Sequence, residues 1–515
     1  MDGFDGRERR YNDVAVQETA TRMARMTRIA ILALPCLVVA AAQPPTDRDV
    51  LARIRAEGME RSQAAAVFNH LTIDIGPRLT ASPAHKRAVD WTRDRLQSYG
   101  LANVRVEPWS FGMGWTLDKL TLEMIEPRYL PLLGYADAWS RSTAGDIAGA
   151  PVLVAGKSPE EIAALGPQLK GAIVLSQPMM TNFVRKDRPQ PSDPDYVPMS
   201  AAYATSVGRG RGAAAAGETP QQRAQRVASA LKDAGASVVI KPSVGEHGTV
   251  FVTGRDGGNG AVPAVTLSGE HYNMIARYLE AGIPVKLRVN VQATFNDDNG
   301  NAYNVLAELP GTDPVLKDEG VMIGAHLDSW HTGVGATDNA DGVTTVVEAM
   351  RILKAIDARP RRTIRVALWA GEEQGLLGSK AWVAQHLAGD ANAAARGKFS
   401  VYFNIDNGTG PIYGWYLQNK EEVRPIFDGW LEPLKAIGAR RNVIEPVGST
   451  DHLSFTDAGV PGFNPIQDYG NYDIRTHHTN MDTVERLQVE DLRQAAIVMA
   501  TFAYNAANLD RKIPR

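Results

Sequence analysis

The second half of the chain alternates between short, almost continuously apolar runs and longer segments in which apolar residues recur with helical spacing. Apolar runs of this kind are typical of strands that are buried on both faces of a sheet. We predict strands at 319–328, 363–373 and 398–406, and helices at 342–357, 375–387 and 421–437. The alternation predicts an α/β fold with a mostly parallel central sheet flanked by helices.

The first half contains two different patterns. Helical spacing extends over residues 47–72 and 83–99, and an extended segment follows at 104–111. From about residue 127 the chain changes to short β-rich runs separated by Gly and Pro turns, which indicates an inserted β-rich domain. We therefore divide the chain into four parts: an N-terminal extension and signal peptide (1–42), a first catalytic part (43–126), the insert (127–298) and a second catalytic part (299–515).

The N-terminus has the features of a secretory signal. Arg25 and Arg28 precede an apolar run at 29–40, and small residues follow up to Ala42. A basic start, an apolar stretch and a small-residue cleavage site are typical of a signal peptide, and the run is shorter than the roughly 20 residues that span a membrane. We expect cleavage after about Ala42, no membrane anchor, and a secreted or periplasmic protein.

Composition narrows the possible functions. The 515 residues are 44% hydrophobic and 22% charged, which suits a globular protein of two or three domains. The formal charge of −3 and the lack of a long Lys/Arg run argue against a nucleic-acid-binding protein. Cys36 is the only cysteine and lies within the predicted signal. The mature protein would therefore use no disulfide, cysteine-ligated zinc or cysteine nucleophile.

Acidic residues and histidines stand at the carboxyl ends of the predicted strands. They are His326, Asp328, Asp338, Glu372, Glu373 and Asp406, and the later stretch "RTHHTNMDT" adds His477 and His478. The carboxyl ends of parallel strands share one edge of a sheet, where ligands bind. Because buried carboxylates are costly unless a cation compensates them, we predict a metal site at this edge.

Imidazole and carboxylate ligands without thiolate suit zinc. Five ligands are too many for one zinc with an open position, but two ions about 3.5–4 Å apart can share a bridging carboxylate. In this scheme one ion takes His326 and Asp406, the other takes Glu373 and one of the paired histidines, and Asp338 bridges. Glu372 is then available as a general base. Asp328 would accept the second ring N–H of His326.

These motifs match a known family. The set "GAHLDSW", "GATDNADG", "WAGEEQG", "NIDNG" and "HHTNMDT" resembles the co-catalytic di-zinc aminopeptidases that include bacterial leucyl aminopeptidases and glutamate carboxypeptidase. The likeness is greatest to the carboxypeptidase Q group, through "DIGPRLTAS" and "HLDSWHTGVGATD". The resemblance implies a specific site. Its zinc ligands would be His326, Asp338, Glu373, Asp406 and His478, with Glu372 as the base.

The resemblance selects His478 over His477, since the last ligand of the family lies four residues before an Asp-Thr pair, here Asp482-Thr483. It also implies that the insert is similar to a protease-associated domain and that a homodimer can form.

The resulting hypothesis is an exported zinc exopeptidase, an aminopeptidase or dipeptidase with two zinc ions per chain. It would hydrolyse the peptide bond next to a free α-amino group by bridging-hydroxide attack, with short peptides or dipeptides as substrates. An N-deacylase or amidase on the same di-zinc site is the main alternative. A non-catalytic, receptor-like binding protein is a further alternative, although its sequence would lack the ligands that are all present here.

Overall fold

The computed structural model describes residues 47–187, 219–254, 261–406 and 408–515. The predicted signal peptide lies outside the described residues. Among the residues described, none of the helices combines the length and apolar character that crossing a bilayer requires.

A six-stranded sheet forms the centre of the fold, in the order β1-β11-β13-β12-β14-β16. Its strands are β1 (Ala102–Ser110), β11 (Asn301–Leu309), β12 (Gly320–His326), β13 (Thr363–Trp369), β14 (Phe399–Asn404) and β16 (Gly462–Phe463). The last four run parallel to one another. In contrast, β11 pairs antiparallel with both β1 and β13. The sheet is therefore mixed: β11 runs opposite to the other strands and lies between the parallel strands and the edge strand β1.

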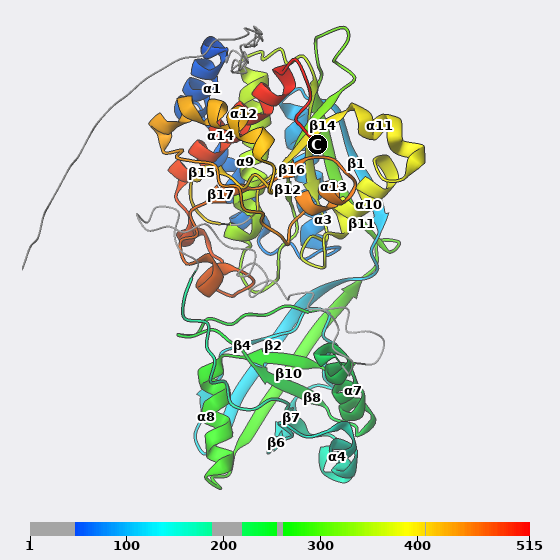
Figure 1. Cartoon of the computed structure of the whole chain (residues 1–515). Helices are drawn as coiled ribbons and strands as arrows, with labels where there is room; N and C mark the ends of the chain where they lie inside the picture. Colours follow the sequence, from blue (N-terminus) through cyan, green and yellow to red (C-terminus); the bar gives the residue numbers. More distant parts are fainter. Residues whose placement is uncertain (1–46, 188–218, 255–260, 407) are drawn as a thin grey trace, which may run out of the picture. The chain divides into compact units, whose positions relative to one another are not determined.

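Helices cover both faces of this sheet (Figure 1). Val321 and Ile323 of β12 belong to one apolar core, in which they pack against helices on one face of the sheet. Those helices are α1 (Arg48–Glu60), α2 (Ala64–Asn69), α3 (Pro83–Ser98), α9 (Asp341–Ala355), α12 (Arg424–Leu431) and α14 (Val489–Asn508). The intervening Met322 belongs to a second core, together with Trp382 and Phe455 of α10 (Leu377–His386) and α13 (His452–Asp457). The side chains of β12 alternate between the two cores, as the period of a strand requires.

The predicted helices and strands of the catalytic parts are confirmed with small shifts at their ends. The segment predicted as one helix at 421–437 is interrupted: a 3₁₀ turn precedes α12, and another (Glu432–Ile437) follows it at Pro433. Several elements were not predicted, among them the strands β11 and β16 and the helices α13 and α14. β11 carries Asn304 and Glu308 within its apolar run, and it lies between β1 and β13 and runs antiparallel to both.

The middle of the chain forms two further sheets. The four-stranded sheet has the order β3-β2-β10-β5, with strands β3 (Leu130–Pro131), β2 (Gly114–Glu126), β10 (Lys286–Asn296) and β5 (Ile147–Gly149). The five-stranded sheet has the order β4-β9-β8-β7-β6, with strands β4 (Gly134–Ala136), β9 (Ala264–Leu267), β8 (Val238–Pro242), β7 (Ile173–Leu175) and β6 (Val152–Leu153).

A shared apolar core joins these two sheets to α8 (Gly269–Glu280), and α4 (Pro159–Ala164) and α7 (Pro220–Asp233) cover the other face of the five-stranded sheet. A small sheet of β15 (Ile412–Trp415) and β17 (Pro465–Gln467) lies within the second catalytic part.

β2 precedes the boundary that we placed between residues 126 and 127, yet it pairs along its length with β10 of the insert. The change to short β-rich runs with Gly and Pro turns begins only after residue 126, because β2 itself has the residue pattern of an ordinary amphipathic strand. The two strands are separated in the sequence by almost the whole length of the insert. No local sequence pattern predicts a pairing over such a separation.

Candidate metal centre

The carboxyl ends of three neighbouring strands carry the predicted site. His326 is the last residue of β12, and Asp406 follows β14 by two residues. After β13 the chain turns at Gly371, whose φ of +70° favours glycine, and a Cβ there would lie 2.8 Å from the ring of Trp109. Glu372 and Glu373 follow this turn directly, so both carboxylates start from a constrained backbone at the edge of the sheet.

His326 lies between two carboxylates. Its Nε2 is 3.2 Å from Oδ1 of Asp338 and 3.3 Å from Oδ1 of Asp406. The three residues form one of two groups of potential ligand atoms that lie close enough to hold a metal ion, among the described residues. This arrangement matches the ligand set that we predicted for the first ion.

Asp338 faces a second histidine with its other oxygen. His478 Nε2 is 3.4 Å from Oδ2 of Asp338 and 2.9 Å from Oε2 of Glu373. The two carboxylate oxygens of Asp338 therefore face different histidines, and each histidine also faces one further carboxylate, Asp406 or Glu373. This is the geometry that a bridging carboxylate requires.

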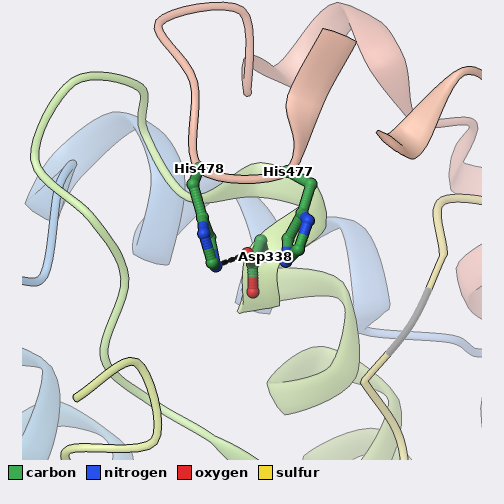
Figure 2. Close-up of side chains that lie close together, drawn as sticks. All are labelled: Asp338, His477 and His478. Carbon is green, nitrogen blue, oxygen red and sulfur yellow. Dashed lines mark ion pairs between the residues drawn. The ribbon is translucent and has the colours of Figure 1, made fainter. Parts of the chain in front are cut away.

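His477 also lies near Asp338 (Figure 2). Asp338, His477 and His478 form the second group of potential ligand atoms. The ring of His477 stacks on Tyr472, with centroids 4.9 Å apart, and lies 3.8 Å from the ring of His478. Glu373 distinguishes the two histidines, since the described contacts pair it with His478.

Asp328 supports the site in a different way from the one we predicted. His326 Nδ1 lies 3.0 Å from the backbone carbonyl oxygen of Asp328, whereas the Asp328 carboxylate is 3.6 Å away. That carboxylate instead accepts hydrogen bonds from the Thr80 hydroxyl and the backbone N–H groups of Glu372 and Glu373. Since a carbonyl oxygen can only accept, Nδ1 carries the proton, and the lone pair of His326 Nε2 points at the carboxylates.

Two further residues hold the site together and were not predicted. Asp482 accepts hydrogen bonds from the backbone N–H groups of Thr337 and Asp338 and from the Thr337 hydroxyl. Arg78 is fully buried and donates to the backbone carbonyls of residues 71, 76, 327, 334 and 335. Asp482 belongs to the motif "HHTNMDT" and Arg78 to "DIGPRLTAS". We used both motifs for the family resemblance and gave neither residue a role.

Replacing Arg78 with methionine is expected to destabilise the fold by about 3–5 kcal/mol, because five buried carbonyl groups lose their donor and Asp482 loses a nearby positive charge. The free energy of unfolding in denaturant measures this change. Arg359, which is exposed, offers the control, and its replacement with methionine should alter stability by less than about 0.5 kcal/mol. Equal stabilities of the two variants would contradict the role given to Arg78.

The pKa values reflect the excess of acid in the site. Burial and the neighbouring Asp338 raise the pKa of Glu373 to about 7. Burial also raises the pKa of Glu372 well above its usual value, and Asp406 and Asp451 add to the rise. Burial alone would lower the pKa of His478, but Glu373 and Asp338 outweigh it and raise this pKa to about 9. Protein groups alone leave the negative charge poorly compensated, which favours a bound cation.

The donor set fits zinc. Within the described part of the chain, His326 Nε2 and Oε1 of Glu373 are buried without a hydrogen-bond partner, and Oε2 of Glu373 faces the ring nitrogen of His478. Native proteins rarely leave such atoms unpaired, and an unpaired group of this kind calls for an explanation such as a bound ion. Imidazole nitrogens and carboxylate oxygens are zinc ligands, and the His326 tautomer leaves Nε2 available for coordination.

Comparison with known proteins places this site in a family. Residues 304–503 match the family Peptidase family M28. Carboxypeptidase Q of Bos taurus is 27% identical over 443 residues, which cover 86% of this chain and 84% of that protein. The crystal structure of a peptidase M28 precursor from Shewanella amazonensis SB2B is 26% identical, with a TM-score of 0.67 over 91% of this chain and 98% of that one.

A zinc aminopeptidase from Bacillus subtilis has the same fold, with a TM-score of 0.57 at 20% identity over 88% of this chain and 96% of that chain. The family match covers β11 to α14, the segment that carries all five predicted ligands and Glu372. Residues 304–503 therefore match peptidase family M28, the co-catalytic zinc peptidases, and the comparisons support a metallo-exopeptidase.

Proposed function

We propose that this protein is an exported exopeptidase that hydrolyses the peptide bond next to a free α-amino group, as an aminopeptidase or dipeptidase with two zinc ions. The observation that carries the proposal is the position of Asp338, whose two carboxylate oxygens face His326 and His478 separately. A carboxylate placed in this way can be shared by two ions, which is the arrangement of two-metal hydrolases.

The ligand assignment follows from these contacts. His326 and Asp406 would hold one zinc, Glu373 and His478 the other, and Asp338 both. Bound zinc ions would lower the pKa of a water and polarise the scissile carbonyl. Glu372 would act as the general base that takes a proton from the attacking water and gives it to the departing amine. Glu372 and Glu373 are adjacent in the turn that follows β13, and the described ion pair with His478 is made by Glu373.

The substrates would be short peptides or dipeptides, because the insert at 127–298 would act as a protease-associated-like domain that narrows access to the site. The motifs shared with the carboxypeptidase Q group are the ground for this expectation and for the proposal of a homodimer. The apolar run at 29–40, before the small residues at 40–42, supports export.

A substrate screen tests the reaction. We expect the mature protein to hydrolyse free dipeptides and Leu- or Ala-arylamides, to lose this activity to a chelator and to regain it with zinc. N-acylated versions of the same substrates should react at least about 100-fold more slowly. They lack the free amine, so the polar groups of the site that would bind it are left unpaired. Faster hydrolysis of the N-acylated compounds would favour the N-deacylase instead.

A further inference from the structure

The His478 segment (residues 475–482) is attached to the insert. Phe251 and Thr479 form an antiparallel bridge. The backbone N–H of Val252 donates to the carbonyl of His478 at 3.0 Å, and the N–H of Asn480 donates to the carbonyl of Val250 at 3.3 Å. These two backbone hydrogen bonds flank the isolated bridge, and the carbonyl of His478 itself takes part.

Side chains extend this attachment. The Asn480 side chain accepts the backbone N–H of Val250 at 2.7 Å and donates to the carbonyl of Gly248 at 3.3 Å. Arg475 donates to the carbonyl of Glu246 and to the Thr249 hydroxyl, both at 2.9 Å. Residues 246–252 of the insert therefore contact the His478 segment on both sides of the two histidines.

The backbone of His478 needs such support. Its φ is +62°, in the left-handed region that residues other than glycine rarely adopt. A residue in this conformation persists when the surrounding structure holds it there. Val250 and Thr249 are fully buried, and Val252 is 1% exposed, so residues 249–252 offer a fixed surface for this purpose. Figure 2 shows the side chain of His478 directed from the His478 segment toward Asp338.

We infer that residues 246–252 position His478 for the metal, and that the insert is thereby part of the second zinc site rather than only a cover of the cleft. The inference rests on the proposed role of His478 as a zinc ligand. Asn480 is a positioning residue in this scheme, since it acts on the ligand through the backbone and through Val250. The first zinc group, His326 and Asp406, has no contact of this kind with residues 246–252 among the described interactions.

Replacing Asn480 with alanine tests the inference in the full mature protein. We expect the affinity of one of the two sites for zinc to fall about 10- to 100-fold, as for other residues that orient metal ligands, while the second site is unchanged. Zinc titration against a competing chelator measures both affinities without reference to turnover. Asn273→Ala is the matched control, because Asn273 makes the same pair of bonds to a backbone segment inside the insert, at Met180.

The outcomes separate the inference from the function on which it rests. If His478→Ala still binds two zinc ions with unchanged affinity, the assignment of His478 fails. If His478→Ala loses one zinc and Asn480→Ala behaves as Asn273→Ala does, the inference alone is overturned.

Hydrogen exchange of the unmutated protein provides a second test that needs no variant to fold. Zinc loading should slow exchange at the amides of Val252 and Asn480, and equal exchange with and without zinc would also overturn the inference.

Discussion

Replacing Glu372 with glutamine is expected to lower kcat by about 10²–10⁴-fold while both zinc ions remain bound. Glutamine has nearly the same shape but takes up no proton, so the water would lose its base and the leaving amine its acid. The backbone N–H of residue 372 would still donate to Asp328, which preserves the turn after β13. Turnover of a Leu- or Ala-arylamide and metal analysis of the same sample measure the two halves of this prediction.

Glu373→Gln is the matched control for Glu372→Gln. Both variants remove one negative charge from the same turn, and both backbone N–H groups donate to Asp328. Only Glu373 lies 2.9 Å from His478, so its replacement should weaken zinc binding as well as activity. Full activity of Glu372→Gln with two zinc ions would disprove the assignment of the base. Equal loss of zinc from both variants would show that Glu372 is a ligand.

The sequence could predict which of these side chains lie close together, because they stand at or just after strand ends. His326, Glu372, Glu373 and Asp406 each follow an apolar run whose strand character is local, and the parallel arrangement brings such ends to one edge. β12 and β14 are far apart in the sequence. Parallel neighbours nevertheless have their carboxyl ends at the same edge of the sheet, so no contact between them has to be known in advance. The two-ion hypothesis also led us to expect Asp338 between the two histidines, because two ions with five ligands would require one shared residue.

What the sequence could not predict are contacts made by backbone groups over long separations. The Asp328 carboxylate was expected to accept the second ring N–H of His326, but it lies 3.6 Å from Nδ1 and instead accepts from the amides of residues 372 and 373 and the Thr80 hydroxyl. No side-chain pattern predicts the pairing of β2 with β10, or of Val252 with His478, because almost every residue type can make backbone hydrogen bonds. The insert therefore looked separate from the site in the sequence and is bonded to it in the structure.

Replacing Asp338 with asparagine is expected to reduce zinc binding from two ions to one or none, and to lower kcat/KM by more than about 100-fold. An amide offers one oxygen where the carboxylate has two, so it can serve the ion beside His326 or the ion beside His478 but not both. Loss of a direct ligand should exceed the 10- to 100-fold effect typical of residues that only orient ligands. Zinc titration and arylamide turnover, measured on the same preparation, give both quantities.

Asp341→Asn is the control for Asp338→Asn, as it makes the same substitution at a buried aspartate three residues away. The Asp341 carboxylate accepts hydrogen bonds from the backbone N–H of Gly342 and the side chain of Gln467, and it has no ion pair with either histidine of the site among the described residues. Its replacement should leave two zinc ions bound. Two tightly bound ions in Asp338→Asn would mean that the ions do not share this carboxylate, and the two-zinc arrangement would then need another bridge.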